Sequence, residues 1–459
     1  MRTMVDTTNF FTELEFGIAA FQDLKPKHVL SVSHNDGDGL TASALICKTM
    51  DFLRVERVQK IFERSESWEN FFDSMMGKYK GIDAVFLTDL GAEEKQLCAT
   101  FQKRKGVHLF ILDHHKISSS EQVDAYPENV HSMNPTRFGL DGLRDIAGST
   151  LTYLFCEKLS PRVRKLSWLP VVGMAGDILK SADKYVSCNK QVLDIALEEG
   201  VVSLHDGVAF LGGMAENKLQ DTLSFSLLPF LKEIGGSHNK ARELLTRAGI
   251  DPGKNVIALG NDDIEDVVKV VGEAIRGQTV LIAGKEGLLR HSFEYNFLVS
   301  IVGDKRHEDA LRLLDLKKPQ AVFVKEYTTY MQQLVTYLGR INSKISIEGS
   351  SYKFFELGPD ATKQLVSDIA SFTSVNNLLT REKLLVIAAK ESGKEYKLSF
   401  RCTPEFVKAK KIGMGILIEK CSKKYGGRGG GHDLAGGWTM PVESYQEFKK
   451  NLKDIDAFI

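Results

Sequence analysis

The first third of the chain contains short apolar runs, and acidic residues lie at or just after the ends of several of them. The runs are HVLSVS from His28, RVQKIF from Arg57, DAVFLTDL from Asp83 and HLFILD from His108, with helix-like segments such as LTASALICKTM between them. Short β-rich runs separated by helical spacers are typical of crossover units, which place parallel strands side by side. The sequence therefore predicts an α/β fold with an N-terminal doubly wound domain and a mainly parallel sheet.

The rest of the chain changes character twice. Helical patterns dominate from about 149 to 199, and mainly helical windows with glycine, proline and asparagine signals continue to about 340. LLVIAAK, ESGK and EYKLSFRC then predict a β-hairpin, followed by the helical run IGMGILIEKCSKKY and a glycine-rich segment. We predict three segments: the α/β domain at 1–200, a helical middle region at 201–344 and a smaller C-terminal α/β domain at 345–459.

The composition is that of a globular protein without a general affinity for polyanions. Of the 459 residues, 43% are hydrophobic and 26% are charged, and 60 basic residues face 60 acidic ones. Any site for nucleic acid must therefore be built locally. The six cysteines include no C-x-x-C pair, and we find no signal peptide and no apolar run of about 18 residues. We expect a cytoplasmic protein with no membrane contact.

Carboxylates follow the predicted strands at their carboxyl ends. Asp36 and Asp38 come after the first run in HNDGDG, where the interleaved glycines permit a sharp turn. Asp89 closes AVFLTD and Asp113 closes HLFILD. Because the carboxyl ends of parallel strands share one edge, where open α/β sheets bind ligands, these side chains should converge. A polar turn after a strand is the alternative for any one of them taken alone.

Two histidines and one more aspartate extend this group. His114 and His115 directly follow Asp113, and Asp177 lies in the apolar segment VVGMAGDIL. Adjacent histidines are commonly a surface accident, and a lone aspartate in such a segment is as often a helix cap or a salt-bridged core residue. The group as a whole carries the argument, because an ionised carboxylate in apolar surroundings needs a partner.

The charge of the group predicts cations. Two carboxylates about 4 Å apart repel by roughly 4 kcal/mol at an effective dielectric near 20, so several on one rim would oppose folding unless cations lay among them. Aspartate and histidine without thiolate favour manganese or magnesium over structural zinc. Two such ions about 3.5 to 4 Å apart are the usual machinery for hydrolysing a phosphate ester. We predict two Mn²⁺ ions per site, with Mg²⁺ as the alternative metal.

The ordered segments HNDGDG, FLTDLG, LDHHK and VGMAGD resemble the four signature motifs of the DHH phosphoesterase superfamily, whose namesake triplet would be residues 113–115. The resemblance implies that Asp36 binds one metal ion, that Asp38 and Asp177 bind the other, and that Asp89 bridges them. Many relatives place the first histidine four residues before the first aspartate, where this chain has Val32. The implied metal ligands are therefore His34 as a substitute, Asp36, Asp38, Asp89, His114 and Asp177.

The same resemblance implies catalytic roles for three residues. His115 would contact the phosphate or act as an acid. Asp113 would orient His114 without binding metal itself, and Asp89 would bind both ions.

A glycine-rich segment near the C-terminus is the second candidate site. GGRGGGHDLAGG, from Gly426 to Gly437, lets the backbone approach a phosphate and offers N–H donors, although a flexible loop is the alternative. It resembles the GGGH element of the DHH-associated C-terminal domain, and SFR at 399–401 resembles the arginine-bearing strand of that domain. The resemblance implies that phosphates or a terminal nucleotide bind to Arg401, Arg428, Gly429, Gly430, Gly431 and His432.

A cluster of lysines precedes this segment. Either it follows a nucleic-acid backbone or it is a solvated helix face. The lysines are Lys408, Lys410, Lys411, Lys420, Lys423 and Lys424.

The chain length and the inserted middle favour the RecJ branch of the superfamily. NPTRFG and DIAGSTLTYLF resemble RecJ, and GGMAENKLQDTLSFSLLPF resembles archaeal RecJ-like proteins associated with the GINS replication complex. We expect an exonuclease that releases mononucleotides from single-stranded DNA or RNA in replication or repair, with GINS as the implied partner. The alternatives are a short-oligonucleotide or cyclic-dinucleotide phosphodiesterase, and a replisome scaffold related to the eukaryotic helicase component. The complete set of acidic ligands weighs against a pure scaffold.

Overall fold

The computed structural model describes residues 7–62, 67–216, 218–341, 347–359, 361–391 and 394–459. The chain forms two compact units. Unit 1 contains Met1–Ala215 and Ile275–Lys325, and unit 2 contains Glu216–Ala274 and Glu326–Ile459. Both units therefore draw on the middle of the chain. The three-segment division with boundaries at 200 and 344 stays a prediction.

Unit 1 is built on a five-stranded sheet in the order β2-β1-β3-β4-β5, in which every neighbouring pair is parallel. This confirms the predicted fold class. The strands are β1 His28–Ser33, β2 Glu56–Ile61, β3 Ala84–Thr88, β4 His108–Leu112 and β5 Val130–Ser132. The associated helices are α1 Thr8–Leu24, α2 Gly37–Leu53, α3 Trp68–Lys78, α4 Glu94–Gln102, α5 Gly148–Leu159, α6 Trp168–Ile178 and α7 Ser187–Glu198.

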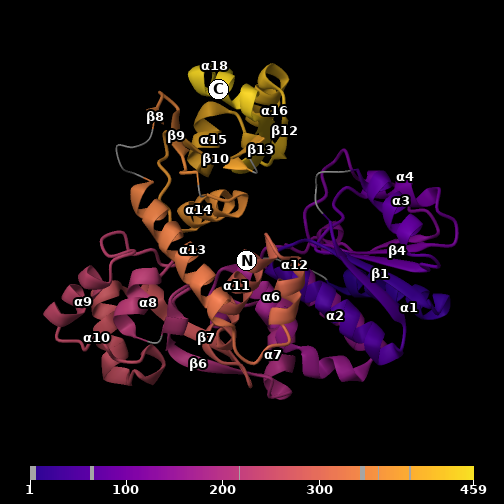
Figure 1. The fold of residues 1–459 in the computed structure, drawn as a ribbon, viewed down its shortest axis with the longest axis horizontal. Helices are drawn as coiled ribbons and strands as arrows, with labels where there is room; N and C mark the ends of the chain where they lie inside the picture. Colours follow the sequence, from indigo (N-terminus) through magenta and orange to yellow (C-terminus); the bar gives the residue numbers. More distant parts are fainter. Residues whose placement is uncertain (1–6, 63–66, 217, 342–346, 360, 392–393) are drawn as a thin grey trace. The chain divides into compact units, whose positions relative to one another are not determined.

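Helices cover both faces of this sheet, as the apolar strands require. Figure 1 shows α3 and α4 on one side, where their aromatic residues pack against β1, β3 and β4. On the other side, Phe21 of α1 and Phe155 of α5 pack on Phe86 of β3, with ring centroids 5.4 and 5.5 Å away. Strands buried on both faces read as continuous apolar runs, which is why the sequence located them.

A second part of unit 1 comes from the middle of the chain. β6 Val202–Val208 and β7 Arg276–Ile282 form an antiparallel pair, and α11 Ser292–Gly303 and α12 His307–Leu313 follow. This region was predicted to be mainly helical, and the strand pair was not predicted. The reason is that only the two ends of β6 are buried, so its apolar pattern is weak. Every residue of α11 is buried, and it packs against α2, α6 and α12.

Unit 2 holds a mixed six-stranded sheet in the order β12-β13-β11-β10-β9-β8. The strands are β8 Ile347–Glu348, β9 Tyr352–Glu356, β10 Leu384–Glu391, β11 Glu395–Arg401, β12 Arg428–Gly431 and β13 Ala435–Pro441. The predicted hairpin is confirmed, because β10 and β11 pair antiparallel. The glycine-rich segment forms the edge strand β12, whose four residues are all exposed.

Helices of unit 2 complete its core. They are α8 Leu219–Phe225, α9 His238–Arg247, α10 Asn261–Val271, α14 Lys363–Val375, α15 Pro404–Lys410, α16 Met414–Tyr425, α17 Val442–Lys450 and α18 Asp454–Phe458, and α13 Ala321–Arg340 enters the unit from unit 1. The helix predicted before the glycines is α16. The fully buried Trp438 lies 5.0 Å from the ring of Phe448, so β13 and α17 are joined through the core.

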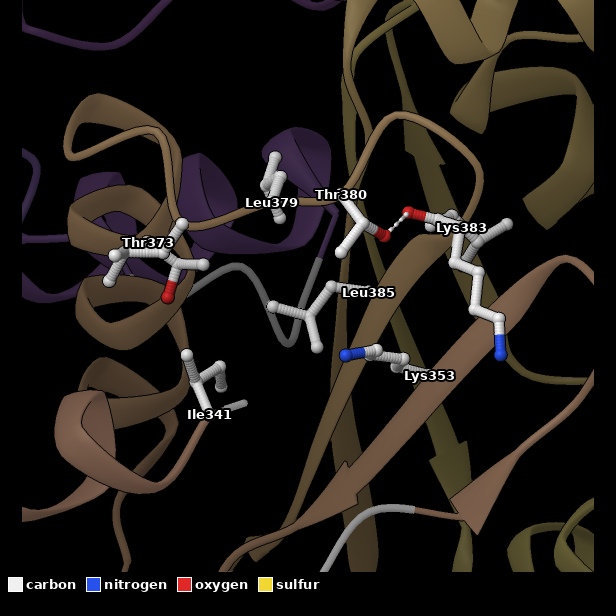
Figure 2. A pocket seen from close by; sticks show the side chains of 9 residues that line it. Ile341, Lys353, Thr373, Leu379, Thr380, Lys383 and Leu385 are labelled. Atoms are coloured by element: carbon white, nitrogen blue, oxygen red, sulfur yellow. Dashed lines mark hydrogen bonds between the residues drawn. The ribbon is translucent and has the colours of Figure 1, made fainter. Parts of the chain in front are cut away.

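A small pocket in unit 2 lies where α14 meets the starts of β9 and β10. In Figure 2, Leu385 lies between Thr373 of α14 and Lys353 of β9. Lys353 and Lys383 both pair with Glu348, at 3.6 and 2.7 Å. One carboxylate therefore offsets part of the positive charge at this pocket.

No helix in the described ranges combines the length and the apolar character needed to cross a bilayer.

Candidate active site

The carboxyl edge of the unit 1 sheet collects the predicted metal ligands. His34 and Asp36 follow β1, Asp89 follows β3, and His114 lies two residues after the end of β4. Three groups have ligand atoms within 4.8 Å of one another: His34 with Asp36 and Asp89, His114 with Asp38 and Asp177, and Asp89 with His114 and His115. The structure thus brings together all six residues for which metal binding was predicted.

Asp89 lies at the centre of these groups. Its Oδ1 is 3.1 Å from Nε2 of His114, and its Oδ2 is 3.6 Å from Nδ1 of His34. The residue has a φ of 57°, a left-handed conformation that aspartate tolerates better than most side chains. This backbone turn follows β3 directly. One carboxylate therefore faces both groups, as the bridging role requires.

Asp38 is fixed by the start of α5. Its Oδ2 accepts a hydrogen bond from the Gly148 N–H at 2.7 Å, and its Oδ1 accepts from the Ser149 N–H at 3.1 Å and from the Ser149 hydroxyl. A Cβ at Gly148 would lie 2.8 Å from Asp38 Oδ2, so this approach needs glycine. This contact was not predicted from the sequence. The signal that could have indicated it is the run of small residues AGST at the start of a helix.

His114 is oriented by a backbone carbonyl. Its Nδ1 lies 2.9 Å from the Gly142 oxygen, which leaves Nε2 directed at carboxylates of Asp89, at 3.1 Å, and Asp177, at 3.3 Å. The resemblance implied that Asp113 orients His114, and the structure differs on this point. The carboxylate of Asp113 contacts His115 instead.

His115 and Asp113 form a separate pair. Nδ1 of His115 lies 2.7 Å from Oδ1 of Asp113, and the His115 side chain is 46% exposed while Asp113 is fully buried. Asp113 raises the pKa of His115 to about 9, although burial opposes the shift. The other carboxylate oxygen of Asp113 is buried and has no hydrogen-bond partner in the described structure. Asp113 therefore favours the protonated form of the partly exposed His115 imidazole.

The shifted pKa values of the buried aspartates indicate that this arrangement costs free energy when no metal ion is bound. Burial, followed by the charge of Asp89, raises the pKa of Asp38 to about 6. Burial and then Asp38 raise the pKa of Asp177. Burial would also raise the pKa of Asp89, but the hydrogen bond with His114 and the nearby imidazole of His34 hold it well below its usual value. A divalent cation among these oxygen and imidazole donors would remove the repulsion, so the donor set fits the predicted metal ions.

In unit 2, the two arginines predicted to bind phosphate differ. Arg401, at the end of β11, donates to the Ser399 hydroxyl and the Phe400 carbonyl, both at 2.9 Å. Burial lowers its pKa, and no described carboxylate pairs with it. Arg428 instead makes a two-point ion pair with Glu395, at 2.9 and 3.0 Å. The guanidinium of Arg401 is therefore the one that lacks a counter-charge.

The glycines of β12 pair with β13 on one side only, because β12 is the edge strand. An edge strand leaves a row of backbone groups unpaired. His432 follows the strand, is exposed, and donates its backbone N–H to Ala435 at 2.8 Å. The segment is therefore an accessible set of backbone donors near an exposed imidazole.

Two protein-family models match this chain, one near each end. The model of the DHH family N-terminal domain matches residues 28–192, and that of the DHHA1 domain matches residues 349–456. An uncharacterized protein of Methanocaldococcus jannaschii is 22% identical over 440 residues, which cover 93% of each chain.

Solved structures share the fold over almost the whole chain. CDC45 from Entamoeba histolytica has a TM-score of 0.68 at 13% identity and covers 98% of both chains. A structure of the exonuclease RecJ bound to manganese has a TM-score of 0.52 at 14% identity, covering 97% of this chain and 94% of the other. RecJ from Thermus thermophilus in complex with Mn²⁺ has a TM-score of 0.53 at 15% identity, covering 97% of this chain and 55% of that one.

The two matched domains contain the two candidate sites: the carboxylates and histidines lie within 28–192, and Arg401 and the glycines lie within 349–456. The chain therefore contains a DHH family N-terminal domain and a DHHA1 domain, and it shares its fold with RecJ and CDC45.

Proposed function

We propose that this protein is a metal-dependent phosphodiesterase that acts as an exonuclease on single-stranded DNA or RNA and releases mononucleotides. The observation that carries the proposal is the position of Asp89 between two groups of ligands, His34 with Asp36 and His114 with Asp38 and Asp177. Bound divalent ions at such a centre supply Lewis acidity and activate water.

The protein's own residues supply the remaining chemistry. His115 is accessible and carries a proton because Asp113 holds it at 2.7 Å. It would donate to a phosphate oxygen as charge builds up there, or to the leaving oxygen. The Gly142 carbonyl and the amide groups of Gly148 and Ser149 fix His114 and Asp38 before substrate arrives. Such preorganisation lowers the cost of reaching the transition state.

Arg401 and the β12 backbone would bind the phosphates of the substrate. Arg401 lacks a carboxylate partner among the described residues, and a guanidinium meets phosphate oxygens in two places. We leave Arg428 out of this proposed phosphate site, because Glu395 already neutralises it. His432 remains a proposed contact because its side chain is exposed beside the strand.

Two alternatives have support. A phosphodiesterase for short oligonucleotides or cyclic dinucleotides would use the same chemistry. A scaffold role is favoured by the similarity to CDC45 over 98% of both chains. Against a pure scaffold, the carboxylates and histidines converge with a charge that costs folding energy, and catalysis would account for their retention.

The decisive experiment is degradation of end-labelled single-stranded DNA and RNA in Mn²⁺, with double-stranded and dinucleotide substrates in parallel. The variant is Asp89→Asn, which keeps the shape and tolerates the left-handed backbone. The control is Asp83→Asn, just before the opposite end of β3. Mononucleotides from long strands, lost in Asp89→Asn and kept in Asp83→Asn, are expected. Cleavage of dinucleotides alone would favour the first alternative, and no cleavage would favour the scaffold.

The proposed partner, a GINS replication complex, rests on the resemblance of the middle of the chain. Purified proteins that fail to co-elute at micromolar concentration would refute it.

A further inference from the structure

Helix α11 is buried on all sides and yet carries several polar side chains. Ser292, Glu294, Asn296 and Ser300 are all among the buried polar residues of unit 1. A buried polar group costs free energy unless it is hydrogen-bonded, so each needs a partner. For Asn296 and Ser300 the partners belong to the segments that carry the predicted metal ligands.

Ser300 holds the loop after β1. Its hydroxyl oxygen accepts a hydrogen bond from the Gly37 N–H at 2.8 Å. Gly37 is the residue between Asp36 and Asp38, one from each group of ligands. A single hydroxyl therefore fixes the backbone that sets the spacing of these two carboxylates.

Asn296 lies between that loop and α6. Its Nδ2 donates to the Gly173 carbonyl at 2.9 Å. A Cβ at Gly37 would lie 2.3 Å from Asn296 Nδ2, and a Cβ at Gly176 would lie 2.3 Å from Asn296 Oδ1. The amide thus fills the volume that side chains would occupy at the residue before Asp38 and at the residue before Asp177.

The end of α11 makes one more close approach to the same loop. A Cβ at Gly303 would lie 2.5 Å from the Asn35 carbonyl oxygen. Helix α11 therefore contacts the loop from Asn35 to Gly37 closely, through Asn296, Ser300 and Gly303.

We infer that Asn296 and Ser300 are positioning residues that tie the Asp36–Asp38 loop to the helix carrying Asp177, and so set the geometry for metal binding. The inference rests on the proposed metal-dependent function and adds a role for part of the middle of the chain. Ligand atoms of Asp38 and Asp177 lie in one group, within 4.8 Å of one another. Without the tie, the loop and the helix could shift, and the spacing of these ligand atoms would change before any ion binds. Residues that support metal ligands typically change metal affinity ten- to hundredfold when they are mutated.

The test is Mn²⁺ affinity of the full-length protein, measured by electron paramagnetic resonance in the absence of nucleic acid. It is combined with the melting temperature of the metal-free protein. The variants are Asn296→Ala and Ser300→Ala. The matched control is Tyr295→Phe, which removes a buried hydrogen bond of the same helix, from the Tyr295 hydroxyl to the Leu313 carbonyl at 2.9 Å.

We expect Asn296→Ala and Ser300→Ala to weaken Mn²⁺ binding about ten- to hundredfold. Their metal-free melting temperatures should fall no further than that of Tyr295→Phe, whose Mn²⁺ affinity should stay within about twofold of the wild type. Ser300→Ala deletes one oxygen and keeps the test decisive if Asn296→Ala fails to fold.

Wild-type affinity in Ser300→Ala, or equal losses of affinity in Tyr295→Phe, would overturn the inference. A wild-type protein that binds Mn²⁺ but cleaves nothing would refute the proposed function and leave the inference standing. A wild-type protein that binds no Mn²⁺ would refute both.

Discussion

The candidate metal centre and the glycine-rich strand β12 present polar groups to a ligand in opposite ways. At the metal centre the side chains are interlocked and several are buried, with Asp38 and Asp89 each 2% exposed. On β12 all four residues are exposed, and three of them are glycines. The first site concentrates like charges at a cost in folding energy, whereas the second offers neutral backbone groups at almost none.

The difference indicates what determines the affinity of each site for its ligand. Buried carboxylates that repel one another bind a cation tightly because the cation relieves an existing penalty. An edge strand has no such penalty to relieve, so its contribution to binding depends on close approach and on Arg401, which has no carboxylate partner among the described residues. Mutations should therefore change both stability and binding at the metal centre, but mainly binding in unit 2.

The largest effect is expected for Asp177→Asn. The pKa of Asp177 is raised by burial and by Asp38, so the neutral form is favoured and the ionised form costs stability above the ordinary pKa of the group. Asparagine resembles the neutral form. We expect the metal-free protein to become more stable at pH 7, and Mn²⁺ affinity to fall more than about a hundredfold.

The measurements are denaturant unfolding in chelator and titration with Mn²⁺. The control is Asp145→Asn, because Asp145 is also buried but is paired with Arg144 at 2.8 Å. Removing that carboxylate should lower stability. If Asp177→Asn also lowered stability, the claim that the metal centre costs folding energy would fail.

A smaller effect, and one confined to binding, is expected for Arg401→Ala. Loss of charge-assisted hydrogen bonds worth about 1.5 to 3 kcal/mol should raise KM for single-stranded substrate about ten- to hundredfold, with kcat little changed. Arg428→Ala is the matched control. Because Arg428 is 61% exposed and already paired with Glu395, its KM should change less than about threefold. Equal effects of the two variants would contradict the distinction between a free and a neutralised guanidinium.

Much of the metal centre could be predicted from the sequence, for a topological reason. Asp89 and Asp113 each follow a strand buried on both faces, and parallel strands bring their carboxyl ends to one edge whatever the loops do. The predicted ligands were therefore found together. The hydrogen-bond partners of Asp38 and His114 could not be predicted in this way, because they are backbone groups of Gly148, Ser149 and Gly142, more than 25 residues away in the chain.

The same limit explains what the sequence left out elsewhere. Arg401 and Arg428 looked equivalent in the sequence, and only the fold shows that Glu395 lies against one of them. Asn296 and Ser300 lie in a buried helix with no motif of its own, so their contacts with Gly37 and Gly173 appear only after the chain has folded. Patterns thus predict which residues share an edge but not which partner each one takes.

The smallest effect is expected within β12 and tests whether a ligand approaches its backbone. A Cβ at Gly430 meets nothing within 4 Å, whereas a Cβ at Gly431 would lie 2.3 Å from the Ala435 carbonyl. Gly431→Ala should therefore destabilise the protein by about 1 to 3 kcal/mol, because overpacking forces the backbone to move. Gly430→Ala should leave the melting temperature almost unchanged, so a roughly three- to tenfold rise in KM would come from contact with substrate alone. An unchanged KM in Gly430→Ala would mean that substrate does not reach this strand, and that Arg401 is the principal phosphate contact of unit 2.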